Sequence, residues 1–366
     1  MKKSFWKKLI LGQAGKKFSA WQIELTTRCS LHCRMCCREG QKSFSQKDMS
    51  LDDFKKILPH LKEVEAVVLE GWGESLLYPN LIECIRLVKK EGPRVGFVTG
   101  GKTLQETYIA ELIQAEVDFI GFSFSGAKPE THDSIRVNSS LQDLLGSIHQ
   151  FKEIMARLQR PNPKMHIVYL LLKDNIQEVP DLLRLARDLR IEKIILIHIA
   201  LVSNDWQEEQ RAFSRQGMED DEKILQEAER MARDFKIQLQ HPPLVPQDVA
   251  VCSENPLRNL YISVDGEVSP CVYLNPPLPS PFKRIFHGAE FQTEKVIFGN
   301  IFHEPFDRIW ANPKYEEFRG CFEHRRKIFE ELYASLWDRD RRKGLEKGSF
   351  PAPPGPCQTC YTIEGA

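Results

Sequence analysis

Three cysteines near the N-terminus have the spacing of a metal site. Cys29, Cys33 and Cys36 place three thiols within eight residues. Thiolates are soft ligands that suit zinc or an iron–sulfur cluster. Structural zinc would need a fourth ligand, for which His32 or Cys37 is available. Three ligands on a four-iron cluster would instead leave one iron open to bind a substrate or cofactor, and the spacing alone leaves both interpretations open.

A second set of cysteines lies far along the chain. Cys252 and Cys271 precede a pair near the C-terminus, Cys357 and Cys360. Two distant pairs that meet in the fold would form a complete four-ligand site for zinc or for an iron–sulfur cluster. Cys84 is expected to be a buried packing residue. Cys321 and Cys37 are expected to be a bystander and a spare thiol, and ligation by either is left open.

The first thiols need a scaffold, and a repeated pattern supplies one between residues 21 and 200. Short apolar runs predict strands at 21–25, 66–69, 95–98, 119–124, 165–172 and 193–199. Amphipathic stretches predict helices between them at 51–61, 80–91, 104–115, 141–158 and 179–189. Repeated βα units form a parallel sheet, and six units are two short of a complete barrel. We expect an α/β fold, a partial (βα)6 TIM-like barrel, with the cysteine triad directly after its first strand.

The pattern of expected helices and strands changes near residue 245. A charged, aperiodic loop is expected at 203–221, a helix at 219–235 and a short strand at 236–240. Beyond these, a hairpin is expected from 260–264 and 267–273, then a helix over 305–319 and a charged helical segment over 323–347. We therefore divide the chain into a basic N-terminal segment (1–20), a barrel (21–245) and a small α+β domain (246–366).

Composition excludes several classes of function. Lys and Arg together number 51, as do Asp and Glu, so the net charge indicates no nucleic-acid partner. The only apolar run in the basic N-terminal segment is too short for a signal peptide or a membrane span. We expect a cytoplasmic protein, and in that reducing compartment clustered cysteines indicate metal ligands rather than disulfides.

The first cysteine motif and two later segments together resemble a known family. CxxxCxxC after a first strand is the signature of the radical S-adenosylmethionine superfamily. LEGWGESL at 69–76 is similar to the family's glycine-rich GGEP motif, and SFSGAKPETHDSIR at 123–136 to its S-x-D-G-x-x-P-E-x-H-D-x-I-R run. Ser125 stands where that run usually has Asp. The resemblance implies a [4Fe–4S] cluster on Cys29, Cys33 and Cys36, whose open iron is chelated by S-adenosylmethionine.

The resemblance also assigns residues to the S-adenosylmethionine pocket. Gly71 and Gly73 would let the backbone approach the cofactor closely. Glu74 would accept a hydrogen bond from its ammonium group, Ser123 would face the ribose, and Arg136 would pair with the methionine carboxylate. The resemblance identifies no residue as a general base.

The late cysteines extend the resemblance. Cys252-x13-Gly-x4-Cys271, then GNI at 299–301 and PFDRIWANP at 305–313, is similar to the C-terminal extension of SPASM/twitch radical enzymes. With Cys357 and Cys360 at its end, the extension resembles the shorter twitch type, which implies one auxiliary [4Fe–4S] cluster. Its simplest role is to accept an electron or to support the floor of the pocket.

The resemblance implies reductive cleavage of S-adenosylmethionine to a 5′-deoxyadenosyl radical, which abstracts hydrogen from a substrate. We favour oxidative modification or maturation of a peptide, protein or cofactor precursor, with a small-molecule dehydrogenase as the alternative. An electron donor such as flavodoxin or ferredoxin would be the protein partner. Two alternatives belong to other functional classes: a zinc-stabilised binding protein without redox chemistry, and a simple electron-transfer protein.

Overall fold

The fold was analysed in a computed structural model of the chain. It describes residues 16–39, 41, 44, 46–101, 104–214, 218–335 and 350–366. Most of the expected basic N-terminal segment and the end of the helical segment expected at 323–347 lie outside these residues.

A ten-stranded sheet forms the centre of the molecule, with the order β14-β11-β10-β1-β3-β4-β5-β7-β8-β9. The six expected strands are all present and follow one another in parallel. They are β1 (Phe18–Ile23), β3 (Val64–Val68), β4 (Arg94–Thr99), β5 (Phe119–Phe124), β7 (Lys164–Leu170) and β8 (Lys193–Ile197). A further parallel strand, β9 (Gln238–Gln240), pairs with β8. The partial barrel is therefore confirmed.

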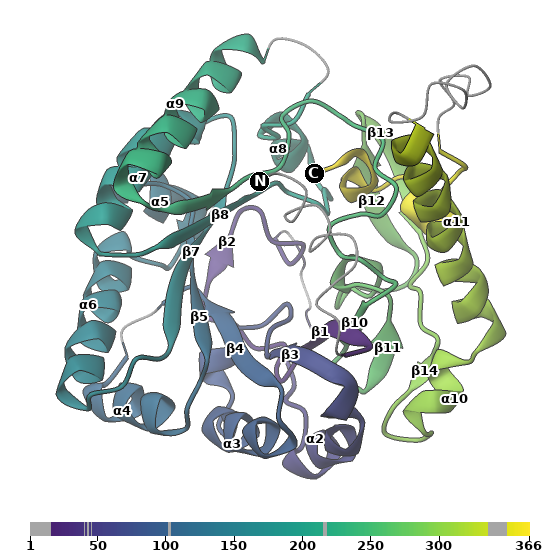
Figure 1. Cartoon of the computed structure of the whole chain (residues 1–366), viewed down its shortest axis with the longest axis horizontal. Helices are drawn as coiled ribbons and strands as arrows, with labels where there is room; N and C mark the ends of the chain where they lie inside the picture. The colour runs from purple at the N-terminus through teal and green to yellow at the C-terminus, as the bar shows by residue number, and fades with distance from the viewer. Residues whose placement is uncertain are drawn as a thin grey trace.

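Helices cover the outer face of this curved sheet (Figure 1). They are α2 (Leu51–Ile57), α3 (Leu81–Glu91), α4 (Glu106–Gln114), α6 (Leu141–Arg157), α7 (Val179–Asp188) and α9 (Glu219–Phe235). Their ends follow from local chemistry. The hydroxyl of Ser50 accepts a hydrogen bond from the Asp53 amide at the start of α2, and Ser140 caps α6 in the same way. Gly92 ends α3 in the left-handed conformation.

Shorter elements connect the main ones. The 3-10 helices η1 (Leu58–Glu63), η2 (Ser75–Leu77) and η3 (Ile176–Glu178) follow α2, β3 and β7. The helix α5 (Pro129–Ile135) follows β5, and α8 (Asp205–Glu209) lies within the region expected to be a loop. Among the described residues, no helix combines the length and apolar character that a membrane crossing requires.

The C-terminal segment continues the barrel sheet. Strand β10 (Asn259–Ile262) pairs in parallel with β1, and β11 (Glu267–Ser269) pairs antiparallel with β10, which confirms the expected hairpin. Strand β14 (Gly299–Asn300) completes this edge. The 3-10 helix η4 (Val272–Leu274) and a second hairpin, β12 (Phe282–Phe286) with β13 (Ala289–Thr293), were not anticipated.

The single helix expected over 305–319 was wrong. The chain forms two helices there, α10 (Phe306–Trp310) and α11 (Pro313–Ser335). Asn312 separates them because its side-chain oxygen accepts a hydrogen bond from the Lys314 amide at 3.0 Å, and Pro313 then opens α11. Two 3-10 helices, η6 (Gly355–Cys357) and η7 (Tyr361–Glu364), end the described chain.

Aromatic packing and a buried guanidinium join the two parts of the chain. The rings of Phe18 and Trp21 on β1 contact Phe306 and Trp310 on α10, with centroids 4.6 to 5.6 Å apart. Arg325 on α11 is fully buried; it donates to the Val249 carbonyl at 2.7 Å and also reaches Asp248 and the carbonyls of residues 250 and 351. The Arg325 side chain thus connects α11 both to the start of the C-terminal segment, at residues 248–250, and to Pro351 near its end.

We expect Arg325→Met to destabilise the chain by roughly 2–3 kcal/mol, because buried carbonyls lose their donor. The ion pair itself adds little, since Asp248 is half-exposed. Urea unfolding of the purified protein measures this loss. Arg326→Met is the matched control, since the one ion pair of Arg326 among the described residues is a loose contact with Glu330, at 3.8 Å. Equal stability of the two variants would contradict the role given to Arg325.

Candidate functional site

The first cysteine triad lies on a loop that a short ladder fixes. After β1 the chain forms β2 (His32–Cys33), which pairs antiparallel with β6 (Arg136–Val137), so that Cys33 faces Arg136. The Arg34 amide also donates to the Ile135 carbonyl at 3.0 Å. The Cys36 amide donates to the Cys33 carbonyl at 3.0 Å, and the pKa of Cys33, raised first by burial, is raised further by the charges of the neighbouring Cys36 and Cys29. The structure therefore brings together the triad that the spacing predicted.

Burial and hydrogen bonding give the three thiols different proton affinities. Burial raises the pKa of Cys33 to about 11, against the lowering effect of Arg136, and it also raises the pKa of Cys29. The pKa of Cys36 is lowered to about 7, chiefly because the buried thiol of Cys37 hydrogen-bonds to it. In this arrangement Cys37 supports a neighbouring thiolate.

No single-ion site is formed here. Among the residues that the structure describes, no three His, Cys, Asp or Glu side chains are arranged to hold one metal ion, as structural zinc requires. An iron–sulfur cluster binds its thiolates through separate iron atoms, so they need not converge on one point. Three free thiols on a fixed loop fit such a cluster in number and chemistry.

The glycine-rich segment after β3 passes very close to the first cysteine loop. A Cβ on Gly73 would lie 2.1 Å from the Thr26 carbonyl oxygen, and one on Gly71 would lie 2.5 Å from the Glu24 side chain. Glu24, at the end of β1, accepts hydrogen bonds from the amides of Trp72 at 2.7 Å and Val264 at 3.3 Å. These glycines are needed for backbone approach, and Glu24 joins the two loops to the C-terminal hairpin.

The Glu74 carboxylate connects the segment after β3 to the end of β4 by hydrogen bonds. Its carboxylate accepts from the Thr99 hydroxyl and the Gly100 amide, both at 2.9 Å, and from the Leu76 amide at 3.2 Å. Both oxygens therefore already have donors from the protein. The contact of Glu74 with an ammonium group stays a prediction.

The segment 123–136 crosses the mouth of the barrel beside these loops. Ser123 is buried at the end of β5, and Arg136 donates through Nε to the Ser125 hydroxyl at 2.9 Å. Burial raises the pKa of Glu70 and Glu74, and the charge of Arg136 acts against this rise, so its side chain lies near the glycine-rich segment. The predicted cofactor residues of both motifs thus meet next to the triad, while their individual roles stay predictions.

Two residues that the sequence analysis missed hold this segment in place. The Asn175 amide donates to the carbonyls of Ser125 at 2.9 Å and Leu170 at 2.8 Å. Glu178 accepts from the amide of Ala127 at 2.6 Å. Both side chains are buried, and each satisfies backbone groups that the turn after β5 leaves unpaired.

The four late cysteines also meet. The thiol of Cys271 has its pKa raised well above the usual value by burial and then by charges that include Cys357, Cys360 and Cys252. Burial likewise raises the pKa of Cys252 to about 12. A shared neighbourhood of four thiols, drawn from a hairpin and a distant terminal turn, matches the complete ligand set that the sequence predicted.

Two more residues border this second set. Arg284 on β12 is fully buried and donates to the carbonyls of Pro356 and Tyr273 at 3.0 Å. Burial raises the pKa of the Cys357 thiol, and the charge of Arg284 acts against this rise. Its charge favours the thiolates that a cluster needs. Cys321 on α11 is near enough to raise the pKa of Cys357, so it lies beside the set rather than far from it. Its ligation stays open.

An acidic pair lies between the two cysteine sets. Glu70 follows β3 and Glu254 follows Cys252, and both line a cavity of about 150 Å³ together with Cys271. Burial raises the pKa of each carboxyl group to about 7, and for Glu70 the charge of Glu254 adds to this effect. A carboxyl group with such a pKa can accept a proton near neutral pH. The only sign of this pair in the sequence was that the acidic Glu70 follows an otherwise apolar run.

Two family models match the chain. That of the radical SAM superfamily matches residues 23–186. That of an iron–sulfur cluster-binding domain, SPASM, matches residues 252–361. The first match runs from the end of β1 into α7, the second covers most of the C-terminal segment, and each includes one of the cysteine sets described above.

Individual proteins resemble the chain over most of its length. A tungsten-containing aldehyde ferredoxin oxidoreductase cofactor-modifying protein of Pyrococcus furiosus is 25% identical over 81% of this chain and 82% of its own. An AdoMet-dependent heme synthase of Methanosarcina barkeri is 24% identical over 80% and 81%. In structure, native anSMEcpe with bound AdoMet and Cp18Cys peptide covers 83% of each chain, with a TM-score of 0.60 and 14% identity.

We expect Gly73→Ala to destabilise the chain by about 1–3 kcal/mol or more, because the new methyl group overlaps backbone atoms that cannot move independently. Thermal unfolding measures the change. Gly146→Ala is the matched control: Gly146 lies within α6 with open space around it, so the same substitution there should stabilise by about 0.5–1 kcal/mol. A Gly73→Ala variant as stable as the wild type would mean that the two loops are not held so closely.

Proposed function

Because the chain belongs to the radical SAM superfamily and carries a SPASM-type domain, we propose that it oxidatively modifies a cofactor precursor, a peptide or a protein. The chain is an enzyme whose cofactors are S-adenosylmethionine, the [4Fe–4S] cluster that binds it, and auxiliary iron–sulfur. In the proposal, Cys29, Cys33 and Cys36 hold the first cluster. Cys252 and Cys271, with the terminal pair 357 and 360, hold one auxiliary [4Fe–4S] cluster.

One observation supports the proposal: a proton acceptor, Glu70, and one thiol of the second set, Cys271, border the same cavity. The bound S-adenosylmethionine supplies, on reduction, the radical that removes a hydrogen atom from the substrate. Oxidation of the resulting substrate radical then releases one electron and one proton. Glu70 is placed to take the proton, and Cys271 in the same cavity marks where the electron can leave. The presence of Glu70 and Cys271 in one cavity favours oxidation of the substrate radical over its reduction by the return of a hydrogen atom.

The rest of the site supports orientation and protection. Arg136, next to Cys33 and the glycine-rich segment, offers a cation for a carboxylate at the cofactor end. Trp72 and Tyr273 contact each other edge to face between the first cysteine loop and the C-terminal segment, with ring centroids 6.4 Å apart. Such apolar walls keep water away from reactive intermediates.

The relatives favour maturation as the kind of reaction. The names of the two relatives aligned over about four-fifths of the chain describe modification of a cofactor and synthesis of heme. The bound peptide in the anSMEcpe structure keeps a peptide substrate open. An electron donor such as flavodoxin or ferredoxin completes the proposed reaction.

We expect Cys33→Ala to abolish formation of 5′-deoxyadenosine from S-adenosylmethionine, since the first cluster loses a ligand. Cys357→Ala should retain this cleavage but lower the iron content by roughly four atoms per chain. Chromatography of the dithionite-reduced, anaerobically purified protein and iron analysis measure both effects. Cys84→Ala serves as the control, since Cys84 is buried in α3, away from both sets.

Two results would contradict the proposal. A colourless wild-type protein that contains stoichiometric zinc would favour the binding protein without redox chemistry. A brown protein that forms no 5′-deoxyadenosine after reduction would favour simple electron transfer. Loss of cleavage in Cys357→Ala, with the first cluster intact, would instead make the second cluster chiefly structural.

A further inference from the structure

A cavity of about 670 Å³ lies at the end of the barrel where β7 and β8 begin, opposite the cysteine loops. Most of the side chains that line it and carry charge are cationic: Lys152, Arg160, Lys164, Arg190, Lys193 and Lys236. Glu192 is the one carboxylate among its described lining residues. This excess of positive charge is unusual in a chain of balanced composition.

Most of these cations are not neutralised by the protein. Lys152 donates to the Arg190 carbonyl at 3.0 Å, and Arg160 pairs loosely with Glu116 at 3.4 Å. The other four have no carboxylate at ion-pair distance among the described residues. Two of the charges also lie close to each other: the pKa of Lys152 is lowered by burial and then by the charge of Arg190. A concave surface with uncompensated charge of one sign concentrates ions of the other sign.

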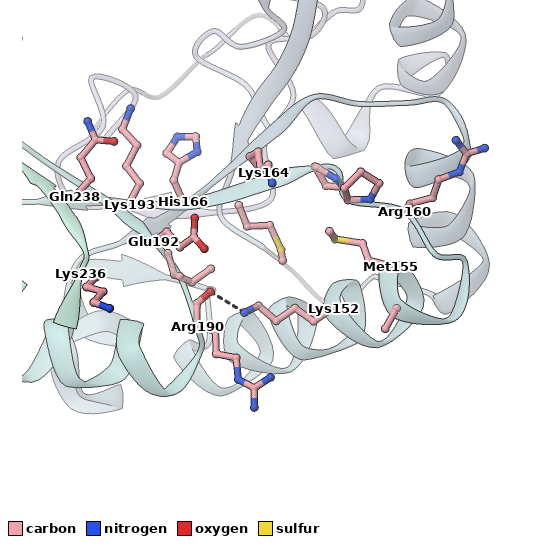
Figure 2. Close-up of a pocket in the computed structure, with 15 residues that line it drawn as sticks. Lys152, Met155, Arg160, Lys164, His166, Arg190, Glu192, Lys193, Lys236 and Gln238 are labelled. Carbon is pink, nitrogen blue, oxygen red and sulfur yellow. Dashed lines mark hydrogen bonds between the residues drawn. The ribbon is translucent and has the colours of Figure 1, made fainter.

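Part of the cavity belongs to the interior face of the sheet. In Figure 2, His166, Lys193 and Gln238 stand side by side and point to the same side of their strands. The register agrees, since Lys193 pairs with Gln238 and His166 with Gly121 across β9, β8, β7 and β5. These side chains therefore form one row across the sheet.

The row lies on the same face of the sheet as Ser123 at the cofactor end of the barrel. Ser123 pairs with Val168, two residues along from the Gly121–His166 pair and on the same face. A rise of about 3.3 Å per residue puts Ser123 roughly 7 Å above the row. Val168 and its neighbour Ile195 are only half-buried although they lie in central strands, so their side chains leave room on this face.

We propose that this basic cavity binds an anionic group of the substrate, a carboxylate or a phosphate, and thereby directs the rest of the substrate toward the cofactor end. Lys164 and Lys193 are the principal donors, and Gln238 adds a neutral one. The assignment rests on the proposed function, because it takes the barrel interior as the substrate site.

Isothermal titration calorimetry of the anaerobically purified holoenzyme tests the assignment, with pyrophosphate and tricarballylate as probes at constant ionic strength. We expect saturable binding of at least one probe at one site per chain. The double variant Lys164→Gln/Lys193→Gln should bind it about tenfold more weakly or worse, because charge-assisted hydrogen bonds are lost. Lys62→Gln/Lys90→Gln removes the same charge from exposed helical positions and should bind as the wild type does.

The two probes distinguish a phosphate-bearing substrate from a polycarboxylate. Absence of saturable binding of either probe to the wild type, or an equal loss of affinity in both double variants, would overturn the assignment. Formation of 5′-deoxyadenosine by the same wild-type preparation separates this inference from the proposed function. If cleavage occurs without anion binding, only the basic cavity is wrong; if the wild type forms no 5′-deoxyadenosine, the proposed function fails first.

Discussion

The parallel ladder between β1 and β10 is the constraint on which the arrangement of both cysteine sets depends. Its four paired positions run from Ala20 with Asn259 to Ile23 with Ile262. One strand leads into the first cysteine loop and the other into the hairpin that carries Cys271, so the ladder brings the second set to the wall of the barrel. Glu24 reinforces it by accepting hydrogen bonds from Trp72, in the loop after β3, and from Val264, in the turn after β10.

Burial of thiols requires compensation, and both sites provide it in a similar way. Removal of thiolates from water is unfavourable unless positive charge or hydrogen-bond donors replace the solvent. Arg136 serves the first site and Arg284 the second, and each guanidinium is itself fixed by hydrogen bonds to neighbouring oxygen atoms. The free thiol of Cys37 adds a donor to Cys36. The acidic pair Glu70 and Glu254 has no such cation at ion-pair distance among the described residues, so burial raises the pKa of both carboxyl groups to about 7.

Much of the barrel was predictable because buried parallel strands are apolar runs and the helices carry ordinary start signals. The cysteine sets were predictable from spacing, and the structure brings each set together. The break at Asn312 was missed because the apolar pattern runs through it. Glu24, Asn175 and Glu178 were missed because one polar residue in a buried segment gives no signal until its partners, 48 to 240 residues away, are in place. The row of His166, Lys193 and Gln238 was missed because it depends on the register between strands, which no single segment of the sequence determines.

The short ladder between β2 and β6 also bears on the order in which the protein is assembled. His32 and Cys33 obtain their partners only when Arg136 and Val137 are present, so the first thiol set can become ordered once about a third of the chain has been made. The second set needs contacts between residues as far apart as Ala20 and Asn259, followed by Cys357 and Cys360. Contacts over such long separations form slowly. During synthesis the chain therefore passes through a stage in which one set of thiols is ready for iron and the other is still exposed to oxidation.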